Sequence, residues 1–414
     1  MKNSREEALK ILYKIEFEGA YPNIALKDIP YELSKQDKAL VTNLVYGVID
    51  KKLTLDYIIG QKSKIKLKKI SKYILLILRL GIYQLIYMDK IPQSAAVNES
   101  VKLAKRYGHS ASSGFVNGVL RSTAKDGYSL PEDETQRLSV EFSMPEWICK
   151  KWIKEFGYDF CKELMVAFSK EPVLTLRPNT LKTDAKSLCD MLDVKSKVVD
   201  DAVECDGFDI ANDKLYLEGY YTVQDRAAMA AAIALEPKAG ESIIDMCAAP
   251  GGKTTHIAEL MQNKGQIKAF DIYDHKVELI KKNAKRLGIT IIDVSKKDAS
   301  VFDETLYDSA DRVLCDVPCS GMGILRRKPD IKWNRKEEDS FYDIQKAILE
   351  NASKYLKKGG VLVYSTCSIE KDENEKVTSD FLAENKNFER IFQKTYYPNV
   401  DGTDGFYICK IKKN

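Results

Sequence analysis

Hydrophobic residues recur every three or four positions through the first 125 residues of the chain. Positions three and four apart share one face of a helix, so this spacing predicts amphipathic helices around a common core. The spacing is clearest at residues 8–15, 40–48 and 74–85, and shorter helices are expected at 94–107 and 112–124. Ser34 and Ser94 stand where N-caps are expected. The pattern predicts an all-α domain over residues 1–126.

The helical pattern ends near residue 126. Residues 127–143 are polar and contain Gly127 and Pro131, which is typical of a linker. Residues 144–234 then mix the two periodicities, which predicts a small α+β module. Within this module the pattern indicates helices at 147–170 and 181–192 and strands at 173–177 and 215–217.

From about residue 235 the chain alternates between strand-like apolar runs and amphipathic helical stretches. Strands are expected at 242–247, 267–272, 289–294, 311–316 and 360–365, and helices at 253–262, 274–287 and 339–357. This alternation is typical of a doubly wound, Rossmann-like α/β sheet. Residues 390–393 and 405–409 are expected to pair as an antiparallel edge. The pattern therefore predicts a multidomain protein whose last domain covers residues 235–414.

The composition fits a soluble globular protein. A chain of 414 residues exceeds one ordinary domain, and 30% charged and 44% hydrophobic residues are typical of soluble proteins. No signal-peptide pattern opens the chain. The most apolar run, residues 73–88, is shorter than the ~20 residues that span a bilayer, so we expect a buried core helix and no membrane association.

Cysteine and histidine usage favours a cytoplasmic protein without a metal site. The nine cysteines are odd in number and scattered, which indicates reduced thiols in a cytoplasm. The three histidines are far apart, and no Cys/His spacing resembles a zinc site.

Positive charge is concentrated at the N-terminus. The net charge is +4, but residues 1–130 hold 22 Lys+Arg against 12 Asp+Glu, which leaves the rest of the chain at −6. A basic third on a nearly neutral protein suggests a polyanionic partner. The densest patch comprises Lys62, Lys64, Lys66, Lys68, Lys69 and Lys72. A solvated helix end or loop explains this patch equally well.

A glycine-rich turn follows the first strand expected in the last domain. Residues 247–253 (CAAPGGK) lack both the G-x-G-x-x-G and the P-loop spacing, yet they bring the backbone close to a ligand at a helix N-terminus. Asp271 ends the next strand, where an acid can bind ribose hydroxyls, and Asp298 could reach an adenine edge. Either Asp could instead be a turn or cap residue. A ribose, an adenine and no pyrophosphate loop together suggest S-adenosylmethionine as the cofactor.

Two cysteines stand apart from the other seven. Cys319, in DVPCSG, and Cys367, in STCS, each follow a buried strand and lie among small polar residues, which leaves a thiol accessible. Cysteines are more often small buried hydrophobes, and six are interpreted in this way: Cys149, Cys161, Cys189, Cys205, Cys315 and Cys409. A thiol beside a cofactor loop points to covalent catalysis.

These motifs carry a resemblance to a known family. Residues 236–414 resemble the S-adenosylmethionine-dependent RNA cytosine-C5 methyltransferases through residues 247–254, 316–320 and 365–368. Residues 1–125 resemble the NusB antitermination-factor fold through residues 98–105 and 115–120. The middle segment matches through residues 177–179 and 223–228, and Met229 departs from the Gln that relatives often have. The fusion of these parts resembles enzymes that methylate 16S rRNA, and the resemblance implies the NusB-like fold for the helical domain.

The resemblance also implies roles for individual residues. Cys367 would attack C6 of the cytosine, Cys319 would assist loss of the C5 proton, and Asp316 would hydrogen-bond the base. In DNA cytosine methyltransferases the Pro-Cys motif supplies the nucleophile, so this division rests on the resemblance alone. The cofactor-binding residues implied are Cys247, Ala248, Ala249, Pro250, Gly251, Gly252, Lys253, Asp271, Asp298 and Asp316. Basic residues that could hold RNA phosphates are Arg326, Arg327, Lys328, Lys332 and Arg335.

The expected partner is 16S rRNA or a small-subunit assembly intermediate, and the protein is expected to be a monomer. Two other functions remain open at this point. The same chemistry would serve a tRNA cytosine-C5 methyltransferase, and an RNA-binding antitermination or assembly factor could retain a vestigial catalytic domain.

Overall fold

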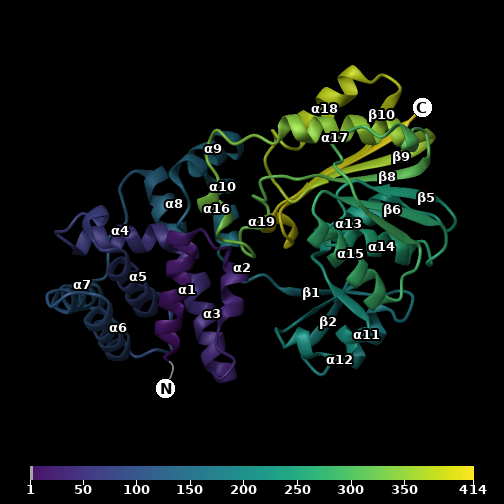
Figure 1. Cartoon of the computed structure of the whole chain (residues 1–414). Helices are drawn as coiled ribbons and strands as arrows, with labels where there is room; N and C mark the ends of the chain where they lie inside the picture. Colours follow the sequence, from purple (N-terminus) through teal and green to yellow (C-terminus); the bar gives the residue numbers. More distant parts are fainter. Residues whose placement is uncertain (1–2) are drawn as a thin grey trace. The chain divides into compact units, whose positions relative to one another are not determined.

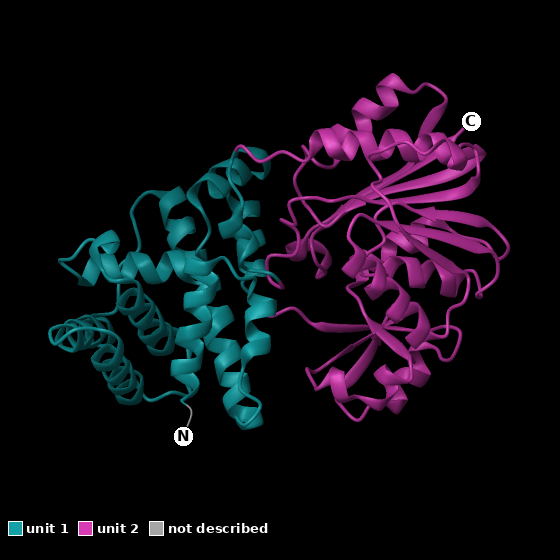
Figure 2. Ribbon diagram, viewed as in Figure 1, with its two compact units in different colours: residues 1–169, 328–337 teal, residues 170–327, 338–414 magenta. Residues whose placement is uncertain are grey.

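The structure, a computed structural model, describes residues 3–414 and divides into two compact units. We call Met1–Ser169 with Lys328–Glu337 the helical unit, and Lys170–Arg327 with Glu338–Asn414 the α/β unit. Figure 2 colours the helical unit teal and the α/β unit magenta. The chain therefore leaves the α/β unit for residues 328–337 and then returns to it.

The helical unit is built around α5 (Lys72–Tyr87), which packs against α1, α3, α4, α6 and α7. Those helices are α1 (Ser4–Glu18), α3 (Lys35–Asp50), α4 (Lys52–Lys62), α6 (Gln93–Tyr107) and α7 (Ser112–Asp126). The others are α2 (Pro22–Ala25), α8 (Glu134–Phe142), α9 (Glu146–Phe156), α10 (Tyr158–Phe168) and α16 (Ile331–Asn334) (Figure 1). The predicted helices are thus confirmed.

Helix α5 is a buried core helix, as its apolar run predicts. Its one buried cation, Arg79, is 4% exposed and binds both carboxylate oxygens of Asp56 at 2.7 Å. Such two-pronged pairing lets a core helix carry a charge. Along residues 3–414, no helix combines the length and apolar character needed to cross a bilayer.

Two local predictions for the helical part are only half correct. Ser34 does cap α3, where its hydroxyl accepts the Asp37 N–H at 3.1 Å. Ser94 is not a cap, because α6 begins at Gln93 directly after Pro92. The segment 127–143, predicted as a linker, contains α8, whose Val140 carbonyl accepts the Thr54 hydroxyl at 2.6 Å. The helical unit therefore continues past residue 126.

Residues 328–337 pack into the helical unit. Lys332 is 3% exposed and binds Asp50 at 2.8 Å, and the Trp333 indole N–H donates to the Ile49 carbonyl at 2.7 Å. A chain without residues 1–125 would expose Trp333 and leave Lys332 without its carboxylate. Truncation at residue 125 is therefore no clean test of the role of the helical domain.

The α/β unit begins with a small antiparallel sheet of order β2-β3-β1-β4. Its strands are β1 (Leu174–Pro178), β2 (Ser196–Val199), β3 (Ala202–Cys205) and β4 (Tyr221–Val223), and its helices are α11 (Ala185–Met191) and α12 (Lys214–Leu217). The strand predicted at 215–217 is wrong. Asp213 accepts the Tyr216 N–H at 2.8 Å and so starts a helical turn there.

A seven-stranded sheet of order β10-β11-β9-β8-β5-β6-β7 forms the rest of this unit, as Figure 1 shows in teal to yellow. Its strands are β5 (Ser242–Asp245), β6 (Gln266–Asp271), β7 (Ile292–Lys296), β8 (Ala310–Asp316), β9 (Leu356–Thr366), β10 (Phe388–Tyr396) and β11 (Phe406–Lys413). Strands β5 to β9 are parallel, and β10 and β11 pair antiparallel, which confirms the predicted Rossmann-like fold and antiparallel edge.

Helices cover both faces of this sheet. They are α13 (Arg226–Leu235), α14 (Gly252–Leu260), α15 (Asp274–Leu287), α17 (Tyr342–Tyr355), α18 (Glu375–Glu384) and α19 (Pro398–Asp401). Side chains alternate along each strand, so Ile244 and Val313 pack with α17 whereas Ile243 and Leu314 pack with α13 and α14. Polar residues then end the strands, including Asp245, Asp271, Asp316 and Thr366. The carboxyl ends of parallel strands share one sheet edge, so these residues gather there.

Candidate active site

The glycine-rich turn joins β5 to α14, as predicted. Gly251 has φ +102°, and a Cβ there would lie 3.3 Å from the Ile280 Cα. The positive φ favours glycine at this position, and the approach to Ile280 leaves little room for a Cβ. The Ala248 N–H donates to the Phe270 carbonyl at 2.7 Å, which fixes the turn against the end of β6. The turn leads directly into the N-terminus of α14, which favours ligand groups of negative character.

The two predicted acids lie beyond the neighbouring strands. Asp271 ends β6, is 7% exposed and accepts the Tyr273 N–H at 3.2 Å. Its strand partner is Lys296, the last residue of β7, so Asp298 lies just past that end of the sheet. Asp298 accepts the N–H and hydroxyl of Ser300 at 2.9 and 2.6 Å. Each of the two acids thus accepts a hydrogen bond within its own turn. Both lie at the carboxyl edge of the sheet, as expected.

Asp245 is a candidate that the sequence interpretation did not single out. It ends β5, is fully buried, and its Oδ2 accepts the Thr254 hydroxyl at 2.7 Å. Its other oxygen, Oδ1, is buried with no hydrogen-bond partner. Burial raises the pKa of Asp245 to about 7, against the opposing effect of the Thr254 hydrogen bond. Its position at a strand end next to the glycine-rich turn was the signal available in the sequence.

Lys253 and Asp316 form an ion pair at the centre of the site. Lys253 Nζ lies 2.7 Å from Asp316 Oδ2, and the Ser365 hydroxyl donates to Asp316 Oδ1 at 2.8 Å. Burial alone would lower the pKa of Lys253, but the facing Asp316 carboxylate raises it overall. The pair links the turn after β5 to the ends of β8 and β9.

The two predicted thiols are in contact. Cys319 Sγ lies 3.2 Å from Cys367 Sγ, and either atom could be the donor. The contact follows from the register of β8 and β9, which pairs Asp316 with Ser365 and so brings the loops after both strands together. The Gly323 N–H donates to the Cys367 carbonyl at 3.0 Å and fastens the loops. The structure thus brings together Lys253, Asp316, Cys319 and Cys367. The first and the last of these residues are 114 positions apart in the sequence.

The remaining cysteines fit their predicted structural role. Cys149, Cys161, Cys205, Cys315 and Cys409 are buried, and Cys189 is partly buried with its Sγ 3.2 Å from Ser196 Oγ. Burial raises the pKa of Cys315 and Cys409, so these thiols are poor nucleophiles.

Three of the five basic residues predicted to hold RNA phosphates do not present free charges. Arg326 is held by Asp404 at 2.7 Å, and Arg327 is held by Asp404 and by Asp225, the latter at 3.1 Å. Lys332 is the buried partner of Asp50. These three residues are therefore paired with carboxylates from other parts of the chain, and their contact with RNA stays a prediction.

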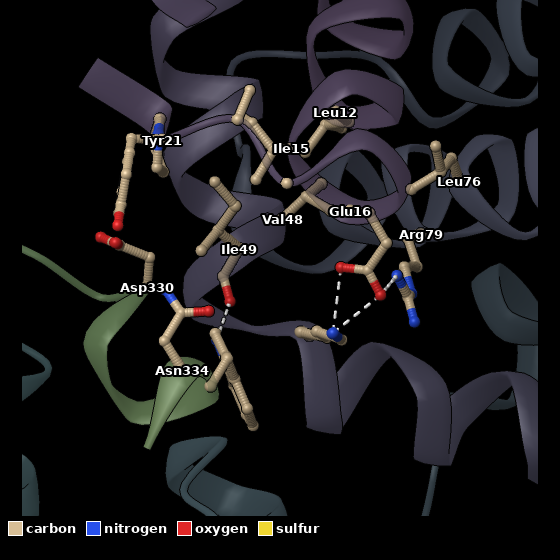
Figure 3. A pocket seen from close by; sticks show the side chains of 15 residues that line it. Leu12, Ile15, Glu16, Tyr21, Val48, Ile49, Leu76, Arg79, Asp330 and Asn334 are labelled. Atoms are coloured by element: carbon tan, nitrogen blue, oxygen red, sulfur yellow. Dashed lines mark hydrogen bonds and ion pairs between the residues drawn. The ribbon is translucent and has the colours of Figure 1, made fainter. Parts of the chain in front are cut away.

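Two cavities lie away from this chemistry. The first cavity lies in the helical unit and has a volume of 440 Å³. It is lined by apolar side chains of α1, α3 and α5, by the Glu16–Lys52 pair and by residues of α16 (Figure 3). The other, of 570 Å³, lies in the α/β unit between the small sheet, α13 and the turn after β10. Neither is lined by Lys253, Asp316 or the two thiols. In the described part of the chain, no three His, Cys, Asp or Glu side chains are grouped to hold a metal ion.

Fold and site together define a Rossmann-like methyltransferase that uses S-adenosylmethionine. Family models match residues 232–412 to 16S rRNA methyltransferase RsmB/F, residues 2–125 to the NusB family, and residues 144–211 to an RsmF/B-like ferredoxin-like domain. The helical domain is thus NusB-like, as the sequence resemblance implies.

Relatives extend the likeness over the full chain. The probable ribosomal RNA small subunit methyltransferase B of Bacillus subtilis is 40% identical, with 99% of this chain and 98% of the relative covered. Its namesake from Synechocystis is 34% identical, with both chains fully covered. The chain therefore belongs to the ribosomal RNA small subunit methyltransferase B family.

Solved structures also resemble this chain. The crystal structure of PH0851 matches with a TM-score of 0.83 at 26% identity and covers 99% of this chain and 98% of its own. A methyltransferase homolog protein from Pyrococcus horikoshii matches 69% of this chain and all of its own, with a TM-score of 0.59 at 28% identity.

Proposed function

We propose that this protein methylates C5 of a cytosine in 16S rRNA through a covalent adduct between Cys367 and C6 of the base. The observation that carries the proposal is the 3.2 Å contact between two thiols beside the Lys253–Asp316 pair. The names of the relatives support rRNA of the small subunit as the substrate. The exposed lysines Lys64, Lys66, Lys68 and Lys69 of the helical unit fit a polyanionic partner.

Two thiols suit this reaction because cytosine C5 is a poor nucleophile. Addition of the Cys367 thiolate at C6 forms an S–C bond and makes C5 enamine-like. Bound S-adenosylmethionine supplies an electrophilic methyl group. Cys319 loses its own proton to solvent once Cys367 is bonded to C6. As a thiolate it then takes the proton that C5 loses, and the S–C6 bond breaks to return the Cys367 thiolate. The target base must first be extruded from any stack, at a cost of a few kcal/mol.

Charge around the thiols supports this division of roles. Lys253 Nζ lies 5.0 Å from the centre of the Phe406 ring, and Cys367 packs against the apolar cluster that contains this ring. An ammonium at that place stabilises a thiolate on Cys367. Asp316, held by Lys253 and Ser365, would accept a hydrogen bond from N4 of the base, or from N3 once N3 is protonated.

The buried acids fit the cofactor. The Oδ1 of Asp245 has no hydrogen-bond partner in the protein, and we infer that the ammonium of the methionine part would satisfy it. Asp271 would bind the ribose, and Asp298 would lie near the adenine. The glycine-rich turn, residues 247–253, would hold the rest of the molecule by its backbone.

Asp271→Ala is expected to weaken S-adenosylmethionine binding by about 1–3 kcal/mol, because ribose hydroxyls would lose a buried acceptor. Isothermal calorimetry measures this directly. Asp274→Ala is the matched control, since Asp274 is exposed in the next turn of the chain and should leave the affinity unchanged. Equal affinities of wild type and Asp271→Ala would remove Asp271 from the ribose site.

The pKa of Asp245 predicts a pH effect. It is about 7 in the folded cofactor-free protein against an ordinary 3.8, so the folded state binds more protons between these values. Stability therefore falls as pH rises through this window, by up to about 4 kcal/mol at 1.36 kcal/mol per pKa unit. Urea denaturation of wild type and Asp245→Asn should show this difference from pH 4 to 8. Binding of the cationic cofactor should in turn be tighter at pH 8 than at pH 6 in wild type only. Parallel pH curves for the two proteins would contradict the assignment.

One experiment separates the candidate functions. The protein is incubated with tritiated S-adenosylmethionine and with rRNA, tRNA or DNA, and the labelled base is mapped. Label at C5 of a cytosine in 16S rRNA supports the proposal. Label in tRNA alone would favour a tRNA methyltransferase, and no label in any substrate would favour an RNA-binding factor.

A further inference from the structure

Glu373 holds the loop that carries Cys319. The residue directly precedes Asn374 and α18, and it is 7% exposed. Its carboxylate accepts the Ser320 backbone N–H, at 3.1 and 3.2 Å from its two oxygens, and the Ser320 hydroxyl at 3.0 Å. Ser320 directly follows Cys319, so the carboxylate fixes this thiol loop through both main chain and side chain.

Glu373 and its neighbour Asn374 hold the loop that carries Cys367. The Ser368 hydroxyl lies 3.1 Å from the Ser320 hydroxyl; because Ser320 donates its own proton to the Glu373 carboxylate, Ser368 donates to Ser320. The Asn374 side chain donates to the Ser368 carbonyl at 3.0 Å and accepts the Thr366 hydroxyl at 2.5 Å. Thr366 and Ser368 flank Cys367. Glu373 and Asn374 thus fasten both loops to the start of α18.

The two thiols face opposite charges. The pKa of Cys319 is raised by its contact with Cys367, by burial, and by the negative charges of Cys367 and Glu373. Lys253, by contrast, lies over the Phe406 ring, and Cys367 packs against the apolar cluster that contains this ring. A carboxylate beside one thiol and an ammonium beside the other polarise the pair in one direction.

We propose that Glu373 is a positioning residue that locks the two thiols in contact and keeps their shared proton on Cys319, so that the thiolate forms on Cys367. The inference rests on the proposed function, in which Cys367 attacks the base. Glu373 acts through Ser320 and Ser368.

Proton balance is consistent with both roles of the pair. Loss of one proton to solvent leaves Cys367 as the thiolate and Cys319 as the thiol. When Cys367 bonds to C6, its negative charge no longer faces Cys319. Cys319 then releases its proton to solvent more readily and can accept the proton from C5. The Glu373 charge thus sets the order in which the two thiols lose their protons.

Other titratable groups surround the pair without reversing this asymmetry. The Tyr364 hydroxyl is buried and donates to the Glu373 carbonyl at 2.5 Å. Glu370 adds negative charge on the Glu373 side. Asp316, on the Lys253 side, is neutralised by its ion pair with that lysine.

Alkylation of the enzyme without RNA or cofactor tests the proposal. Iodoacetamide reacts with thiolates, so peptide mass spectrometry gives the rate at Cys367 and at Cys319 separately. In wild type Cys367 should react faster. Glu373→Gln keeps the shape and removes the charge, and the Cys367:Cys319 rate ratio should fall about tenfold for each unit lost from the Cys319 pKa. The alkylation profile of Cys319 should move to lower pH.

Three further variants complete the test. Glu373→Asp keeps the charge and should retain most of the ratio. Glu389→Gln removes an exposed carboxylate from β10 and should leave the ratio unchanged. Ser368→Ala breaks the link to the second loop and should lower the ratio even if Glu373→Gln does not fold. A ratio within about twofold of wild type in Glu373→Gln, or in Ser368→Ala where Glu373→Gln is unfolded, would overturn the proposal.

Failure of the proposed function would look different. If Cys367→Ala retained methyl transfer, the covalent role of Cys367 would be wrong, but the alkylation ratio and its response to Glu373→Gln would be unaffected. The two outcomes are therefore separable.

Discussion

Replacing Cys367 by alanine is expected to reduce methyl transfer to the level measured without enzyme and to remove every covalent protein–RNA species. Without a thiol at this place nothing adds to C6, and C5 stays too weak a nucleophile to accept a methyl group. The measurement is tritium transfer from S-adenosylmethionine to 16S rRNA.

Cofactor affinity provides the control for Cys367→Ala. The cofactor loop and Asp271 belong to other strand ends, so calorimetry should give the same S-adenosylmethionine affinity as wild type. If Cys367→Ala instead keeps methyl transfer and Cys319→Ala loses it, the thiol roles are reversed, as in the DNA enzymes.

Arg177→Ala is expected to destabilise the α/β unit by about 3–5 kcal/mol, the cost of leaving one member of a buried ion pair uncompensated. Arg177 in β1 is 3% exposed and binds Glu259 of α14 with two hydrogen bonds, at 2.7 and 3.0 Å. It also donates to the Gly252 carbonyl at 2.5 Å. Loss of the guanidinium would leave the Glu259 carboxylate, whose side chain is 0% exposed, without its partner.

Hydrogen exchange of peptides from β5 and α14, measured along a urea series, reports the stability of the α/β unit. Arg226→Ala is the matched control, because its partner Asp200 is 78% exposed and its other partner, Glu204, keeps an ion pair with Lys197. Such pairs contribute about 1 kcal/mol or less. The double variant Arg177→Met, Glu259→Leu should recover much of the loss, since it removes both charges. Equal destabilisation by Arg177→Ala and Arg226→Ala would contradict the buried-pair account.

The sheet and the meeting of its strand ends were predictable from sequence. Strands with continuous apolar runs, followed by small polar residues, define the carboxyl edge of a parallel sheet. That logic predicts that Lys253, Asp316, Cys319 and Cys367 lie at one edge of the sheet. The structure adds the contacts themselves, at 2.7 Å for the ion pair and 3.2 Å for the thiols.

Partners far apart in sequence were not predictable. Lys332 looked like a free cation in a basic loop, but its carboxylate is Asp50, 282 positions away. Arg326 and Arg327 likewise meet Asp404 across the α/β unit. Glu373 carries no sign of its role in a polar stretch, because that role depends on where Ser320 lies. The strand predicted at residues 215–217 was wrong for another reason. There the helix-capping hydrogen bond of Asp213 starts a helical turn, although the three residues that follow have strand-like side chains.

The most direct test of the covalent mechanism uses Cys319→Ala. This variant retains Cys367, so attack on C6 and methyl transfer remain possible, but the C5 proton is not removed and the S–C6 bond persists. Incubation with S-adenosylmethionine and 16S rRNA, followed by denaturing gel electrophoresis, should show a protein–RNA band for Cys319→Ala and none for Cys367→Ala. A band with Cys367→Ala alone, or full activity in both variants, would contradict the account.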